Sequence, residues 1–257
     1  MGKLLQKLDK AASSGPGPIG FGMVSREKRS TMVLLVALPK ADHKLGAAAI
    51  ESGGDGLLLA SSDETVTKNL DGLAPKEIPV GVVLDAFGKD GEMPKELLCD
   101  FVVIDPSTAP VGVLHGDKPD KFISFDAATP DSLVRSIAAL PIAGVVLAKS
   151  GDEMRVKDLM AYVRLGQLSG KPLIATVNSA VSAEELEILR DMGILGVVVE
   201  FPDVKQKAQL AALKKRIESL PPRKKRDDRI RAMLPAIAPS PEAPPGREPE
   251  PEPDEDE

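Results

Sequence analysis

Two lysines and four carboxylates stand at or just after the ends of apolar runs, where side chains could do chemistry. The runs end, in chain order, on Lys40, Ser61, Asp85, Asp105, Asp126, Lys149, Asn178 and Glu200. A desolvated lysine amine can attack a carbonyl or remove a proton, and grouped carboxylates can bind an oxygen-preferring divalent ion. These residues can act together only if the fold brings the ends of the runs to one place.

The apolar runs recur with a regular spacing. They cover residues 32–38, 56–60, 79–86, 101–106, 121–127, 144–150, 172–178 and 196–201, and successive runs start 20 to 28 residues apart. The runs are continuous rather than alternating, which is typical of parallel strands covered on both faces. Helical patterns follow most of them, as in 43–54, 152–170, 182–193 and 203–220, with a capping-box serine at Ser182 and closing glycines. The order predicts an α/β fold, a (β/α)8 TIM barrel over residues 32–220.

Three segments depart from this repeat. Between Asp105 and Lys121 there are two prolines and room for barely one helical turn, so we expect a reduced fourth helix or a loop. Residues 1–31 form an N-terminal extension, in which residues 1–12 are either a short amphipathic helix that plugs the barrel or a frayed end. Residues 221–257 are first basic and then rich in proline and acid, which predicts a disordered tail from about Ala236.

In this barrel class the chemistry occurs at the carboxyl ends of the strands, so the charged run ends are predicted to share one mouth. Two alternatives remain open at each position. Asp105 and Asn178 could instead bind their own backbone in Asx turns or helix caps. A shift of one residue in register would also turn a side chain outward, toward the helices.

Lys149 follows the sixth run, in GVVLAKSGDE (144–153). In this respect the sequence resembles the aldolase-type barrel enzymes, over residues 32–220 in architecture and at Lys149 alone in motif. The resemblance implies an imine-forming lysine, which must be deprotonated by desolvation or by a neighbouring cation such as Lys40. Asp126 on the adjacent strand would stabilise the ammonium instead, and this counts against an aldolase. The predicted catalytic residues are Lys149, Asp126, Lys40 and Glu200.

Three carboxylates on successive strands suggest a second chemistry. Asp85, Asp105 and Asp126 are predicted metal ligands for a divalent ion such as magnesium, with Lys149 as a general base opposite. The arrangement is similar to that of the enolase superfamily. That superfamily carries a large N-terminal capping domain, however, and only about 30 residues precede the first run here.

Composition excludes several classes of function. One cysteine and two histidines exclude an internal disulfide and a Cys/His zinc site. A net charge of −6 and 3% aromatic residues make nucleic-acid binding improbable. No apolar run approaches the roughly 20 residues of a membrane helix, and without a secretory signal the expected location is the cytoplasm. The stretches after the last two runs lack glycine and include Glu200, which disfavours a phosphorylated substrate.

These observations predict a small-molecule lyase or isomerase that acts at the strand ends through Lys149 and carboxylates. The alternative is a barrel without catalytic activity that serves as a scaffold or binding module. Such a barrel would use its surface, or a protein partner that binds the tail. A regulatory nucleic-acid contact through the basic segment 214–231 is the least favoured hypothesis. The expected cofactor is either none or a divalent metal.

Overall fold

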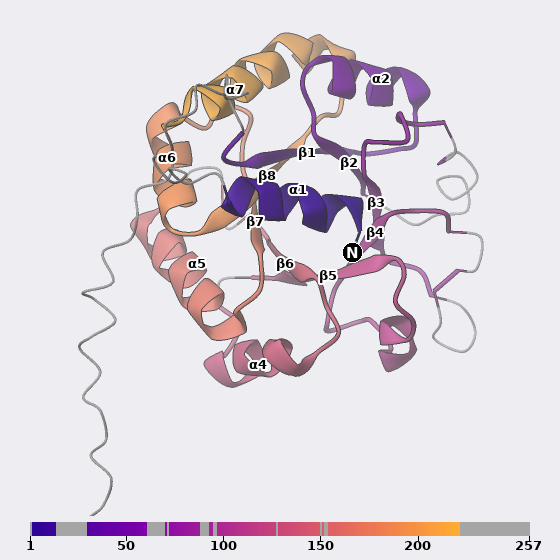
Figure 1. The fold of residues 1–257 in the computed structure, drawn as a ribbon, viewed down its shortest axis with the longest axis vertical. Coiled ribbons are helices and arrows are strands. Elements are labelled where there is room, and N and C mark those ends of the chain that lie inside the picture. The colour runs from indigo at the N-terminus through magenta and orange to yellow at the C-terminus, as the bar shows by residue number, and fades with distance from the viewer. Residues whose placement is uncertain are drawn as a thin grey trace, which may run out of the picture. The chain divides into compact units, whose positions relative to one another are not determined.

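Eight parallel strands close into a barrel in the computed structural model, each paired with its neighbours in sequence and β1 paired with β8 (Figure 1). The strands are β1 (Val33–Leu38), β2 (Gly56–Leu59), β3 (Val80–Leu84), β4 (Phe101–Ile104), β5 (Asp120–Phe125), β6 (Gly144–Leu147), β7 (Leu173–Thr176) and β8 (Ile194–Glu200). Every strand overlaps its predicted run, which confirms the (β/α)8 TIM barrel. The structure describes residues 2–13, 30–60, 70, 72–87, 93–94, 97–126, 128–149, 151 and 154–221.

The strands are apolar throughout because both of their faces are covered. Along β6, Val146 packs in a cluster inside the barrel, whereas Val145 and Leu147 pack in a second cluster beneath the helices. The same alternation holds along β1, where Leu35 faces inward and Leu34 outward. A side chain's position in this alternation therefore decides whether it meets the interior or the helix layer.

Helices surround the barrel in the predicted places (Figure 1). They are α2 (His43–Glu51), α4 (Asp131–Ser136), α5 (Val156–Ser169), α6 (Ala183–Asp191) and α7 (Lys207–Ser219). The capping box at Ser182 is confirmed, since its Oγ accepts from the N–H of Glu185 at 3.1 Å and Glu185 Oε2 accepts from the N–H of Ser182 at 2.8 Å. Gly170 ends α5 with φ of 62°, a left-handed conformation that favours glycine.

The fourth helix is reduced to the single 3₁₀ turn η1 (Val111–Leu114), as predicted. Lys121 at the start of β5 reaches back into the loop between η1 and β5, where its Nζ donates to the carbonyls of Gly116 at 2.6 Å and Pro119 at 3.4 Å. The residue is only 3% exposed, and its burial lowers the pKa of the ammonium. Lys121 thus holds together the loop that replaces a helix.

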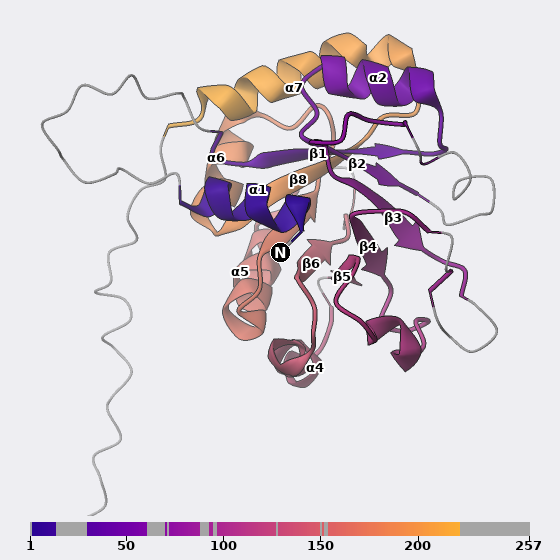
Figure 2. The same ribbon diagram turned by 45° about the vertical axis from the view of Figure 1, so that its right-hand side comes forward.

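The N-terminal segment forms the helix α1 (Lys3–Ala12), which plugs the barrel at the amino ends of the strands (Figures 1 and 2). Leu4, Leu8 and Ala11 are buried in the interior cluster with the barrel side chains. At the rim, Lys7 Nζ donates to the carbonyl of Asp55 at 2.8 Å, and Lys3 pairs with Asp100 at 2.8 Å. The plug hypothesis is confirmed and the frayed end is excluded.

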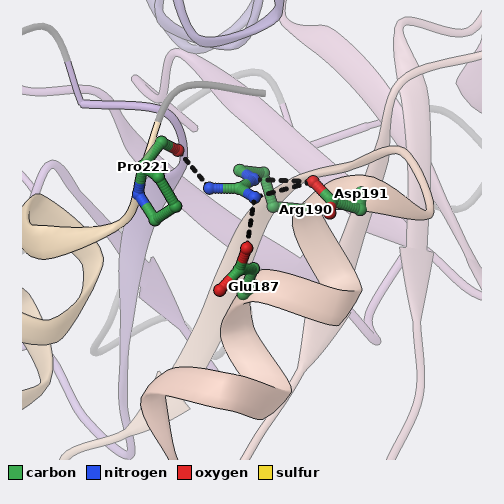
Figure 3. A network of polar contacts seen from close by, with 4 residues as sticks. All are labelled: Glu187, Arg190, Asp191 and Pro221. Atoms are coloured by element: carbon green, nitrogen blue, oxygen red, sulfur yellow. Dashed lines mark hydrogen bonds and ion pairs between the residues drawn. The ribbon is translucent and has the colours of Figure 1, made fainter. Parts of the chain in front are cut away.

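Two arginines join α6 and the loop before it to α7 and the residue that follows it. Arg190 of α6 is fully buried and binds Glu187, Asp191 and the carbonyl of Pro221, which follows α7 (Figure 3). Arg216 of α7 donates from Nη1 to the carbonyl of Val181 at 2.8 Å. This hydrogen bond from α7 therefore fixes the loop between β7 and α6.

Some predictions concern other parts of the chain. The disordered tail from about Ala236 and the run end at Ser61 lie outside the described residues. Within the described ranges, no helix is long and apolar enough to span a membrane.

Candidate functional site

The alternation along the strands divides the predicted charged ring into two sets. Asp105 continues the inward row of Val103, and Glu200 continues that of Val198. Asp85, Asp126 and Asn178 follow the ends of β3, β5 and β7, in line with the inward rows of Val83, Phe122 and Ile174. Lys40 and Lys149 instead continue the outward rows of Leu38 and Leu147, which pack beneath the helices. The alternation therefore assigns the acids to the inward rows and the two lysines to the outward rows. Beyond the strand ends this division does not hold strictly, because Lys149 lines one cavity with Thr176 and Asn178, which continue the inward row of Ile174.

Three of the inward residues bind their own backbone. Asp105 Oδ1 accepts from the N–H of Ser107 at 2.8 Å, and Asn178 Oδ1 accepts from that of Ala180 at 3.3 Å. Asp126 Oδ1 likewise accepts from the residue two positions further on, at 2.5 Å. The Asx turns predicted as the alternative for Asp105 and Asn178 are confirmed.

The three predicted metal ligands are exposed, and the described residues contain no group of three or more His, Cys, Asp or Glu side chains close enough to hold a metal ion. The structure thus places Asp85, Asp105 and Asp126 on successive strands without gathering them into such a group. Magnesium binding stays a prediction without a preformed site.

Lys40 is remote from the sixth strand in the order of the barrel, since β1 pairs with β2 and β8. Its side chain is 70% exposed and its Nζ lies 4.0 Å from Asp42, the N-cap of α2. Backbone N–H groups of Lys44 and Leu45 bind this aspartate and lower its pKa. The structure does not bring Lys40 beside Lys149.

Lys149 lines a cavity of about 370 Å³ at the carboxyl ends of β6 and β7, which we call the β6–β7 cavity. The other lining residues come from the loop after β6, from α5, from β7 and its loop, and from α6: Gly151, Met154, Asp158, Tyr162, Thr176, Val177, Asn178, Ala180, Val181 and Glu185. Of the predicted catalytic residues, only Lys149 lines it. Asp126 and Glu200 end other strands.

Sequence reasoning missed Tyr162, Asp158 and Glu185. Tyr162 is the single tyrosine of the chain and lies within the predicted helix 152–170. Glu185 was visible only as part of a capping box, which indicates a helix start rather than a site. No sequence pattern links α5 to the end of β7, because packing between helices brings these residues together.

Tyr162 is the most informative group in the cavity. Its side chain is buried at 5% exposure and lines the cavity. Desolvation raises the pKa of this phenol, and the nearby Asp158 adds to the rise. A raised pKa keeps the phenol protonated at neutral pH, so a ligand in the cavity could accept a hydrogen bond from it.

The two carboxylates of the cavity begin helices. Asp158 Oδ2 accepts from the N–H of Arg155 at 2.9 Å at the start of α5, and Glu185 caps α6 in the same way. Each uses one oxygen, and in the described part of the chain the second oxygen of each has no partner. An amine, a neutral phenol and two available carboxylate oxygens thus surround one small space.

Comparisons with known proteins support the fold. No protein-family model matches the sequence, and no curated protein does. The structure is similar to phosphoribosyl anthranilate isomerase from Thermus thermophilus (TM-score 0.54, 14% identity, 73% of this chain and 99% of that chain). It is also similar to orotidine 5'-monophosphate decarboxylase from Methanocaldococcus jannaschii (0.53, 11%, 72% and 98%) and to KGPDC from Streptococcus mutans (0.54, 14%, 74% and 98%). At these identities the likeness shows the fold alone, so the chain is a protein of the TIM-barrel class.

Proposed function

We propose that the protein is a lyase or isomerase of a small carbonyl compound, with its reaction in the β6–β7 cavity. The observation that carries the proposal is that Lys149 and the buried Tyr162 line the same cavity. The cavity lies at the carboxyl ends of the strands, where barrel enzymes place their chemistry. Its volume suits a small molecule.

The two groups have complementary roles. The Tyr162 hydroxyl donates a hydrogen bond to the carbonyl oxygen and stabilises negative charge that develops there, which its raised pKa permits because the phenol stays protonated. The Lys149 amine takes the proton from the adjacent carbon, and the electron pair moves to the carbonyl oxygen. In the lyase version the amine instead attacks the carbonyl carbon, a C–N bond forms, and the oxygen leaves as water.

The similar structures include proteins named as an isomerase and a decarboxylase, which agrees with this reaction class by analogy of fold. The names of these two proteins also mention phosphoribosyl and monophosphate groups. A phosphate at the end of β8 is disfavoured in this chain. There Asp203 already accepts the N–H of Lys205 at 3.1 Å, and the carboxylate of Glu200 ends the strand.

Reductive trapping tests the lyase version. The protein is incubated with small aldehydes and ketones and cyanoborohydride, and peptides are mapped by mass. An adduct at Lys149 is expected, absent from Lys149→Met and retained in Lys205→Met, whose lysine is 90% exposed elsewhere on the barrel. Adducts spread evenly over surface lysines would contradict a reactive amine at this site.

Proton exchange tests the isomerase version. Carbonyl compounds are incubated in deuterium oxide, and incorporation at the adjacent carbon is followed by NMR. Catalysed exchange should fall by at least about 100-fold in Lys149→Met and by about 10- to 100-fold in Tyr162→Phe. Exchange that both variants retain would place the chemistry elsewhere.

A second candidate is a barrel that binds a ligand without converting it. It is favoured by the Asx turns of Asp105, Asp126 and Asn178, which give polar strand ends a purely structural role. A metabolite that raises the melting temperature, with neither adduct nor exchange, would support this function over catalysis.

A further inference from the structure

The carboxylate of Asp120 is an unsatisfied acid at the amino end of the barrel. Asp120 begins β5, and its Oδ2 is a buried oxygen without a hydrogen-bond partner among the residues that the structure describes. Such an oxygen is unfavourable, because its desolvation is not offset by a hydrogen bond or by an opposite charge. The fold therefore leaves a place for a donor beside Asp120.

Gly2 is the residue that lies against this carboxylate. It directly precedes α1, and a Cβ built on it would overlap Asp120 Oδ2 and lie only 2.5 Å from Asp120 Cγ (Figure 1). A larger residue at this position would require the carboxylate to move. Since glycine has no side chain, the one positive charge that it can carry is an α-ammonium.

The neighbouring cations bind other groups. Lys3 Nζ pairs with Asp100 Oδ1 at 2.8 Å. Lys121, the next residue of β5, donates from Nζ to two backbone carbonyls of the preceding loop, and both Asp117 and Asp120 stabilise its charge. Neither ammonium donates to Asp120 Oδ2.

We propose that the mature chain begins at Gly2 and that its α-ammonium binds Asp120 Oδ2. A peptidase hydrolyses the amide bond between Met1 and Gly2. The oxygen of water adds to the carbonyl carbon of Met1, which leaves as a carboxylate, and the nitrogen of Gly2 becomes an ammonium. The resulting charge-assisted hydrogen bond fixes the start of the plug to β5. The carboxylate also offsets the unfavourable interaction of this ammonium with the positive end of the α1 dipole.

The first residue of the purified full chain tests the cleavage. Intact mass and sequencing of the N-terminal peptide should show a chain that starts at Gly2 with an unmodified amine. Retention of Met1, an acylated Gly2 or a start at any other residue overturns the proposal.

The reactivity of the α-amine tests the ion pair. An α-ammonium has an ordinary pKa of roughly 7.7–8.0, and a carboxylate beside it raises this pKa. Acylation of Gly2 at pH 8, followed by peptide mass spectrometry, should therefore be at least about threefold faster in Asp120→Asn than in the unaltered protein. Asp9→Asn is the matched control, because Asp9 is an exposed acid of the same helix, and it should react like the unaltered protein. Equal rates in Asp120→Asn and in the control overturn the ion pair.

The melting temperature gives a second readout. Because the pKa of the α-ammonium is raised in the folded state, its stabilisation is present below about pH 7 and is lost as the pH rises through the folded value. The unaltered protein should melt about 2–4 °C above Asp120→Asn at pH 6.5, and this difference should shrink above roughly pH 9. A difference that stays constant between pH 6.5 and pH 10 overturns the ion pair. If Asp120→Asn does not fold, the pH profile of Gly2 acylation in the unaltered protein decides, and an apparent pKa of about 8 or lower overturns it.

Discussion

Replacement of Arg190 by methionine removes the buried cation that joins α6 to the end of α7. The side chain is 1% exposed, and its guanidinium meets Asp191 Oδ1 at 2.7 Å and Glu187 Oε1 at 3.3 Å. It also donates to the carbonyl of Pro221 (Figure 3). Methionine keeps much of the stem volume, so the loss reports mainly on the polar contacts.

The expected loss of stability follows from the two carboxylates, Glu187 and Asp191, that the substitution leaves without their cation. Removal of one partner from a buried ion pair costs about 3–5 kcal/mol, because the other charge stays unpaired. The side chains of Glu187 and Asp191 are 35% and 26% exposed, so water can rehydrate them in part. We therefore expect the low end, about 3 kcal/mol in the free energy of unfolding. For a domain of this size the melting temperature should fall by about 6–12 °C.

Urea unfolding followed by circular dichroism measures this loss. Arg164→Met is the control, because Arg164 makes a more exposed pair with Asp131 and should lose at most about 1 kcal/mol. The double variant of Arg190→Met with Asp191→Asn should recover part of the loss, because residues 190 and 191 are then both neutral and only Glu187 keeps an unpaired charge. A loss below about 1 kcal/mol for Arg190→Met, equal to that of the control, would refute the structural role.

Two further predictions concern stability. Leu8→Ala should lower the free energy of unfolding, measured in urea, by about 2–5 kcal/mol, because Leu8 of α1 is fully buried inside the barrel. The control Leu98→Ala should change it by less than about 0.5 kcal/mol, because Leu98 is 80% exposed. Equal effects of the two substitutions would contradict the plug. Burial raises the pKa of the Cys99 thiol from 9.0 to about 12, and the nearby Asp100 adds to the rise. The folded state thus keeps a proton that the unfolded chain loses, and stability present below pH 9 is lost as the pH rises toward 12, at up to about 1.4 kcal/mol per pH unit. Cys99→Ala should show a shallower fall between pH 9 and 10, and identical slopes would contradict this.

The sequence predicted the barrel because its signals are local. Continuous apolar runs at a steady spacing require parallel strands with both faces covered, and a capping box such as that of Ser182 marks a helix start wherever it folds. The reduced fourth helix followed from two prolines and a short interval. The plug was one of two alternatives, because the sequence does not say whether Leu4 and Leu8 find an apolar surface.

The site was predictable only in part. Lys149 was predicted and lines a cavity together with Asn178, another predicted strand end, but Asp158, Tyr162 and Glu185 were not among the expected residues. One position in the strand alternation separates Lys149 from the inward acids, and boundaries read from sequence are uncertain by more than that. Tyr162 and Glu185 reach the same cavity from two helices, which no motif connects.

Local stretches of sequence thus determine the order of the strands, the helix starts and the class of fold, because burial patterns and backbone preferences act over a few neighbouring residues. The β6–β7 cavity, and the positions of Tyr162, Asp158 and Glu185 around it with Lys149, result from packing. Closure of the barrel and the seating of α5 and α6 against it place side chains together that lie up to 36 residues apart in the chain. The chemistry of this protein therefore depends on long-range contacts, whereas its architecture depends on local ones.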